Sequence, residues 1–162
     1  MIYAGLVREG VECFENVRKR FDGERRNPWD EPECGHHYAR AMAAWSGVLA
    51  LSGFRYDGTK QTVNLSPPFA DAVFRCFWST ATGWGVFARQ QSAGKTFFRI
   101  RVDHGSLPVR SFELKAHGAK ARATLGGAEL RHTLEVETGA IIRLEQPLTL
   151  GDGQELVLEV LA

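Results

Sequence analysis

Short strand patterns follow one another at close spacing from Phe54 onward, and they constrain the fold more than any other feature of the sequence. Thr96–Val102 is the plainest of them, because apolar side chains fall on one face of an extended chain and arginines on the other. The expected strands are Phe54–Gly58, Thr62–Leu65, Val73–Trp78, Trp84–Gln90, Thr96–Val102, Leu107–Ala116, Lys120–Leu125, Ala128–Glu137, Ala140–Glu145 and Gln154–Leu161. Glycine turns separate the later strands, so we expect them to pair antiparallel.

Two helical patterns precede these strands. Residues 2–21 place apolar side chains at steps of three and four with charged side chains between them, which predicts an amphipathic helix. Residues 35–52 are rich in helix formers and are apolar almost all round. Such a helix is usually buried against several neighbours, and the one preceding helix cannot cover it. We therefore expect the helical part to pack into a larger assembly.

Composition excludes several classes of function. The 162 residues are 44% hydrophobic and carry 20 Lys plus Arg against 19 Asp plus Glu, a net charge of +1. This balance argues against nucleic-acid binding and against a polybasic membrane patch, both of which need clustered cations. No run of apolar residues is long enough for a membrane span. Charged residues near the N-terminus exclude a signal peptide, and three widely spaced cysteines suit a reducing compartment, so a cytoplasmic location is expected.

The segment 27–40 holds the densest group of chemically active residue types. One interpretation is a metal site formed by Glu33, Cys34, His36 and His37, with Cys34 and His37 at helical i, i+3 spacing. Adjacent histidines point about 100° apart on a helix, however, and no second ligand pair follows downstream. Another interpretation is a nucleophilic Cys34 at a helix N-terminus. Neither is favoured, and we expect no metal ion, no cofactor and no catalytic residue on this chain.

The same segment suits recognition of a sugar. A sugar site needs carboxylates that accept hydrogen bonds, cationic or imidazole groups that donate them, and an aromatic face for the C–H side of the ring. Glu31, Arg40, His37 and Trp29 supply that set. From spacing alone, a salt bridge between Glu31 and Arg40 that ties the loop to the helix explains the pair equally well.

The run 27–42, followed by residues 49–58, resembles the C-terminal end of glycoside hydrolase family 116, which includes the non-lysosomal glucosylceramidases and bacterial β-glucosidases. Residues 77–80 and 83–85 resemble the family's segment after its last barrel helix. The resemblance implies an α+β fold, with residues 1–53 forming the last helices of an (α/α)6 barrel and residues 54–162 an antiparallel β-rich region. The sequence departs from the family pattern at Asp30 and at Pro32, where proline fixes φ beside Glu31.

The resemblance also implies a function. In the family, a glutamate and an arginine at the spacing of Glu31 and Arg40 hold the hydroxyl groups of the sugar in the −1 subsite, and His37 and Trp29 belong to the same motif. The two catalytic carboxylates of the family lie upstream of the matching segment. We therefore expect the C-terminal part of a β-glycosidase, inactive alone, whose partners are a β-linked sugar or glycoside and a larger chain that completes the barrel. The alternatives are a non-catalytic β-rich module that binds a ligand or a protein, and a gene remnant without activity.

Overall fold

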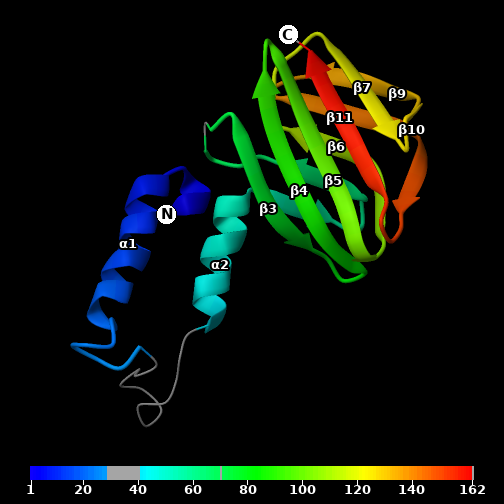
Figure 1. Cartoon of the computed structure of the whole chain (residues 1–162). Coiled ribbons are helices and arrows are strands. Elements are labelled where there is room, and N and C mark those ends of the chain that lie inside the picture. Colours follow the sequence, from blue (N-terminus) through cyan, green and yellow to red (C-terminus); the bar gives the residue numbers. More distant parts are fainter. Residues whose placement is uncertain (29–40, 70, 162) are drawn as a thin grey trace. The chain divides into compact units, whose positions relative to one another are not determined.

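A computed structural model describes residues 1–28, 41–69 and 71–161 of the chain, and it describes residues 41–44 by their backbone alone. The chain divides into two compact units, Met1–Leu51 and Ser52–Ala162. The first unit is helical and the second is built from strands (Figure 1). Each unit has its own internal packing.

The helical unit begins with a short 3-10 turn rather than with the single long helix that periodicity predicted. The 3-10 turn η1 spans Ile2–Ala4, and the helices α1 and α2 span Val7–Arg20 and Ala41–Ser52. Gly5 separates η1 from α1, because its φ of +84° lies in the left-handed region and stops a right-handed helix. The prediction of one helix over residues 2–21 was therefore wrong at its first turn.

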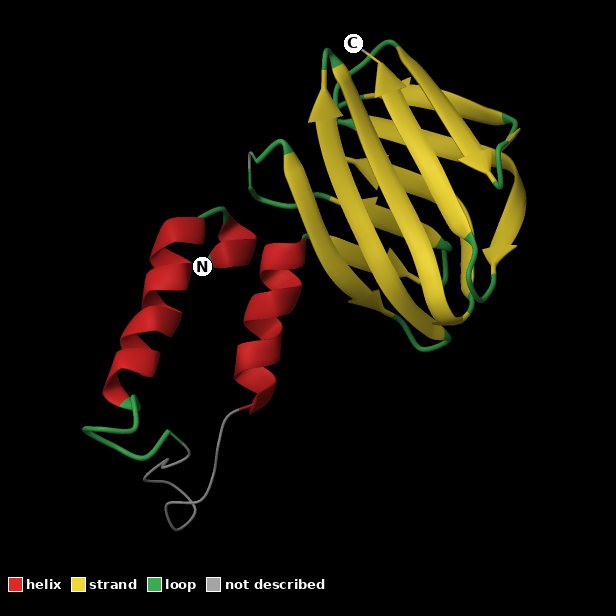
Figure 2. Cartoon of the chain, viewed as in Figure 1, coloured by secondary structure: helices red, strands yellow, loops and turns green. Residues whose placement is uncertain are grey.

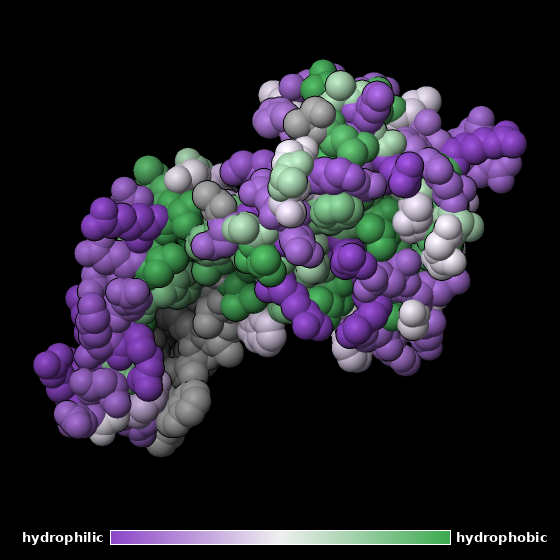
Figure 3. All heavy atoms as spheres, turned by 45° about the horizontal axis from the view of Figure 1, so that its top comes forward, coloured by the Kyte–Doolittle hydropathy of each residue, from purple (hydrophilic) through white to green (hydrophobic). Residues whose placement is uncertain are grey.

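Two glycines let side chains approach the helices closely in this unit. An ideal Cβ built on Gly47 of α2 would lie 2.5 Å from Cζ of Phe14, and one built on Gly10 of α1 would lie 2.4 Å from Cγ1 of Ile2. The Phe14 ring therefore packs directly on the α2 backbone. The visible face of α1 is mostly hydrophilic (Figure 3), in agreement with the predicted amphipathic helix.

The described residues of the second unit form two sheets that face one another as a β-sandwich (Figure 2). The five-stranded sheet has the order β1 (Phe54–Asp57), β2 (Thr62–Leu65), β6 (Leu107–Leu114), β10 (Ala140–Leu150), β9 (His132–Val136). The six-stranded sheet has the order β3 (Val73–Ser79), β4 (Gly83–Ser92), β5 (Lys95–Gly105), β11 (Glu155–Leu161), β7 (Lys120–Leu125), β8 (Ala128–Glu129).

The core of the sandwich lies between the inner faces of the two sheets, as period-two burial along the strands requires. Both sheets contribute large side chains that are almost fully buried; among them are Trp78, Phe87, Phe98, Phe112, Leu65, Ile100, Leu107, Ile142, Leu150, Leu156 and Leu158. Trp78 satisfies its polar atom inside this core, because its Nε1–H donates a hydrogen bond of 3.1 Å to the carbonyl of Arg101.

Strand pairing follows the antiparallel expectation in every described pair except one. β2 and β6 are parallel neighbours, with Val63 opposite Phe112 and Leu65 opposite Leu114. Between these two strands the chain passes through β3, β4 and β5 of the other sheet, so no tight turn joins them. The region is therefore antiparallel apart from this one pair, which the expectation for strands joined by short turns does not cover.

The predicted strand Ala128–Glu137 is two strands in the structure. β8 pairs with β7 of the six-stranded sheet, whereas β9 pairs with β10 of the five-stranded sheet. The chain crosses between the sheets at Leu130 and Arg131. His132 stabilises this crossing, since its two ring nitrogens lie 2.8 Å from the carbonyl oxygen of Leu130 and 3.1 Å from that of Ala121.

Candidate functional site

The sugar-binding candidates Trp29, Glu31, His37 and Arg40 all lie outside the described residues. The same holds for the alternative metal or thiol site of the segment, formed by Glu33, Cys34, His36 and His37. The predictions for this segment therefore remain predictions. Among the residues that the structure does describe, no group of three or more metal-ligating side chains comes together. No helix in the described part of the chain is long and apolar enough to cross a membrane.

Two aspartates of the β-sandwich have structural roles. Asp57 accepts hydrogen bonds of 3.0 Å from the backbone amides of Thr59 and Lys60, so it closes the turn after β1. Asp103 accepts a 2.6 Å hydrogen bond from Nε of Arg101 on the outer face of β5.

The described cysteines do not form a nucleophilic site. Cys13 is exposed, and its nearest sulfur partner is Sδ of Met1 at 3.7 Å. Cys76 lies partly buried on β3, and burial raises the pKa of its thiol, which disfavours the thiolate. The Cys76 thiol is therefore not activated for covalent chemistry.

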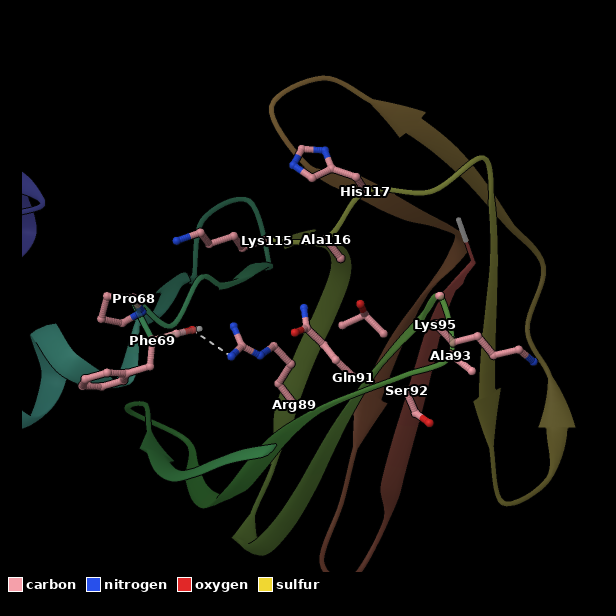
Figure 4. A pocket seen from close by; sticks show the side chains of 12 residues that line it. Pro68, Phe69, Arg89, Gln91, Ser92, Ala93, Lys95, Lys115, Ala116 and His117 are labelled. Atoms are coloured by element: carbon pink, nitrogen blue, oxygen red, sulfur yellow. Dashed lines mark hydrogen bonds between the residues drawn. The ribbon is translucent and has the colours of Figure 1, made fainter. Parts of the chain in front are cut away.

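One end of the β-sandwich carries an open groove of about 680 Å³, here called the Arg89 groove (Figure 4). Three connections line it: Pro68 and Phe69 after β2, residues 91–96 of the β4–β5 hairpin, and residues 115–117 after β6. The side chain of Arg89 on β4 completes the lining. The groove thus combines loops with the ends of β4 and β5 and with the side chain of Arg89 from further inside β4.

Arg89 is the most unusual side chain of this groove. It is only 3% exposed, and its Nη2 donates hydrogen bonds of 2.8 Å to the carbonyls of Phe69 and Asp71. Its Nε is buried and has no acceptor among the described residues. Burial lowers the pKa of the guanidinium, while the Coulombic attraction of Asp71 raises it. Arginine nevertheless stays protonated in proteins, so a positive charge lies in the wall of the groove.

An unpaired buried donor is expensive. Leaving a buried hydrogen-bonding group without a partner costs about 1–3 kcal/mol, and more when the group is charged. Proteins keep such groups at sites where a ligand or an ordered water supplies the missing acceptor. The buried Nε of Arg89 therefore needs an acceptor, from a ligand or from an ordered water, that the described residues do not supply.

Sequence reasoning missed Arg89, although a signal for it exists. Gly85, Phe87 and Arg89 occupy alternate positions of one strand, and all three are buried. An arginine in line with the inward-facing residues of a strand is therefore the pattern to look for.

Two further hollows, of about 630 and 420 Å³, lie near β9 and β10, and their lining includes residues 129–131, 144 and 145. Their charges pair among themselves: Arg131 lies 3.6 Å from Glu145, and Arg143, which lines the larger hollow, lies 3.1 Å from Glu135. These hollows therefore offer a ligand less unpaired charge than the Arg89 groove.

No protein-family model matches this sequence, and a comparison with curated proteins finds no match. Two solved structures of glycoside hydrolases are similar to the chain. A GH127 β-L-arabinofuranosidase from Geobacillus stearothermophilus T6 has a TM-score of 0.42 and 8% identity over 73% of this chain and 18% of its own. An α-L-rhamnosidase from Dictyoglumus thermophilum has a TM-score of 0.41 and 14% identity over 86% of this chain and 16% of its own.

The chain thus spans less than a fifth of the length of these enzymes. TM-scores below 0.5 at such low identity do not establish a common fold, so the similarities decide neither the architecture nor the activity of this chain.

Proposed function

We propose that this chain is the C-terminal part of a β-glycosidase of the glucosylceramidase and β-glucosidase type, and that residues 29–40 bind the sugar. The observation that carries the proposal is the run 27–42, in which Glu31 and Arg40 stand at the spacing of a sugar-holding pair in glycoside hydrolase family 116. In this role Glu31 accepts hydrogen bonds from the sugar hydroxyl groups and Arg40 donates them. His37 and Trp29 complete the subsite.

The helical unit supports a place in a larger helical assembly. Leu6 and Val17 of this unit are 49% and 58% exposed, and Val48 of α2 is 39% exposed. A small unit that leaves this much apolar surface in water gains stability when further helices cover it. In an (α/α)6 barrel, the other helices of the barrel would cover the apolar side chains of these last helices.

Bond cleavage would come from outside this chain. A retaining glycosidase needs two carboxyl groups about 5–5.5 Å apart, one as nucleophile and one as acid and base. Glu31 and Glu33 flank a proline and would point the same way about 6–7 Å apart along an extended chain. The contribution of Glu31 and Arg40 is therefore orientation of the sugar, which lowers the entropic part of the barrier.

The test is a native pull-down of the tagged chain from lysate of its source, followed by β-glucoside hydrolysis by the eluate. The proposal expects a larger partner and measurable hydrolysis. Glu31→Gln should recover the same partner but lower kcat/KM roughly tenfold or more, because charge-assisted hydrogen bonds are worth about 1.5–3 kcal/mol. Glu24→Gln, at an exposed loop position, is the matched control and should change neither the recovered partner nor kcat/KM.

An inactive wild-type eluate, or equal hydrolysis with Glu31→Gln, would contradict this function. The second candidate, a non-catalytic binding module, is favoured by one observation, the Arg89 groove of the β-sandwich. That module would tolerate Glu31→Gln and would bind its ligand without the helical unit.

A further inference from the structure

The lining of the Arg89 groove is positive and contains no carboxylate among its described residues. Arg89 places a buried charge in its wall, and Lys115 and His117 stand at its rim (Figure 4). Lys95 contributes less, because its Nζ forms a 2.8 Å salt bridge with Glu159. Sites for neutral sugars usually hold the hydroxyl groups with carboxylates, and the described lining of this groove has none. An acceptor for the Nε–H of Arg89 would therefore come with the ligand.

The neutral polar side chains of the groove narrow the chemical class of its ligand further. Gln91 and Ser92 are exposed, Thr96 is half-buried, and all three can exchange hydrogen bonds with hydroxyl groups. The volume of about 680 Å³ falls within the usual range of 300–1,000 Å³ for small-ligand sites. We propose that the Arg89 groove binds a small hydroxylated anion, a sugar carrying a carboxylate or a phosphate group, with the oxyanion next to the Arg89 guanidinium.

Arg89 is poised for this role by its own hydrogen bonds. Nη2 is held by the carbonyls of Phe69 and Asp71, which fixes the guanidinium plane and leaves Nε as a buried donor without a partner among the described residues. Gln91 lies beside Arg89 in Figure 4 and is exposed, so its side chain can turn aside for the anion at little cost. A fixed donor of this kind binds with less loss of side-chain entropy than a flexible lysine.

This inference is independent of the proposed glycosidase function. Every residue of the groove belongs to the unit Ser52–Ala162, whereas the sugar-holding pair belongs to residues 29–40. Failure of the Glu31→Gln test would leave the groove untouched, and failure of the test below would leave Glu31 and Arg40 untouched.

The test is titration of the full chain with glucuronate, glucose 6-phosphate and glucose at physiological salt, followed by the ¹H–¹⁵N resonance of Arg89 Nε–H. Binding of either anion at millimolar concentration with a shift of this resonance supports the proposal, and the better ligand identifies the oxyanion as carboxylate or phosphate. Glucose should produce no shift. An unmoved Nε–H resonance with both anions, or an equal response to glucose, overturns the proposal.

Two variants locate the anion. Lys115→Gln should weaken binding about two- to fivefold, the effect of one exposed charge pair, and leave the fold intact. Lys60→Gln is the control. Lys60 pairs with Asp57 in the turn between β1 and β2, at the end of β2 that lies away from the groove, so this variant should leave binding unchanged. Equal affinities of the two variants would place the anion outside the groove and overturn the proposal. Arg89→Met should abolish binding, and its circular dichroism spectrum shows whether the sandwich still folds.

Discussion

At the scale of single residues, Trp78 is the side chain on which the sandwich core depends most directly. It is fully buried, its ring stacks on Phe54 with 5.8 Å between centroids, and its Nε1–H pairs with the Arg101 carbonyl. Trp78→Phe should lower the free energy of unfolding by roughly 2–4 kcal/mol, because it creates a cavity and removes a hydrogen bond inside the core. Urea denaturation followed by circular dichroism measures this loss.

Trp84→Phe is the matched control for Trp78→Phe. Trp84 is 51% exposed and makes only a tilted ring contact with His104 at 6.2 Å. The same chemical change should therefore cost less than about 0.5 kcal/mol there. Equal losses at the two positions would contradict the claim that burial makes the difference.

The candidate site residues differ in how far the sequence predicts them. Glu31 and Arg40 are predicted from residue types and from the family resemblance, and they lie outside the described residues, so they remain a prediction. Arg89 was not predicted, because arginine side chains are mostly exposed in proteins. Its buried position depends on hydrogen bonds to the carbonyls of Phe69 and Asp71, which lie 20 and 18 residues away in the sequence. A polar side chain becomes a site through such distant partners, which a local pattern does not contain.

At the scale of elements, Gly85 sets how β4 approaches β5. The register between these strands shifts between Trp84 and Gly85, and an ideal Cβ on Gly85 would lie 1.9 Å from the carbonyl oxygen of Arg101. Gly85→Ala must therefore push the two strands apart, since a backbone atom cannot rotate away as a side chain can. We expect a loss of about 3 kcal/mol or more in the free energy of unfolding.

Gly151→Ala provides the comparison for Gly85→Ala. Its added Cβ would meet only Oε1 of Gln154, at 3.9 Å, and its φ is not positive. We expect a change within about 0.5 kcal/mol, measured by the same denaturation curves. A small effect of Gly85→Ala would mean that β4 and β5 can separate without disturbing the core.

The elements themselves were predicted well where the pattern is local. β2 and β7 have the predicted bounds, because alternation and turn residues define both of their ends. β10 continues to Leu150 beyond its predicted end at Glu145, since a register irregularity between Arg143 and Leu148 accommodates Pro147. The change of sheet between β8 and β9 was not predictable in this way, because the sequence of each segment predicts a strand whichever sheet that strand joins.

At the scale of the whole molecule, the buried core cluster of the sandwich lies entirely within one of the two units. Its residues run from Phe54 to Val160, and no described side chain of the helices belongs to it. A domain with its own core and with satisfied strand pairing can fold alone. Ser52 is the natural place to begin such a fragment, because its Oγ accepts a hydrogen bond of 3.1 Å from the amide of Phe54 at the start of β1.

Residues 52–162 expressed alone should therefore unfold in one cooperative transition with a β-type circular dichroism spectrum. The matched control is the fragment 67–162, which lacks β1 and β2 and with them the buried side chains of Phe54, Val63 and Leu65. Since β2 is the parallel neighbour of β6, its removal leaves an edge of β6 unpaired and one side of the core open to water. The shorter fragment should lose the cooperative transition or aggregate. A cooperative transition in the shorter fragment would contradict the placement of the core, because β1 and β2 would then be dispensable. The absence of such a transition from residues 52–162 would also contradict it, because the helical unit would then be essential.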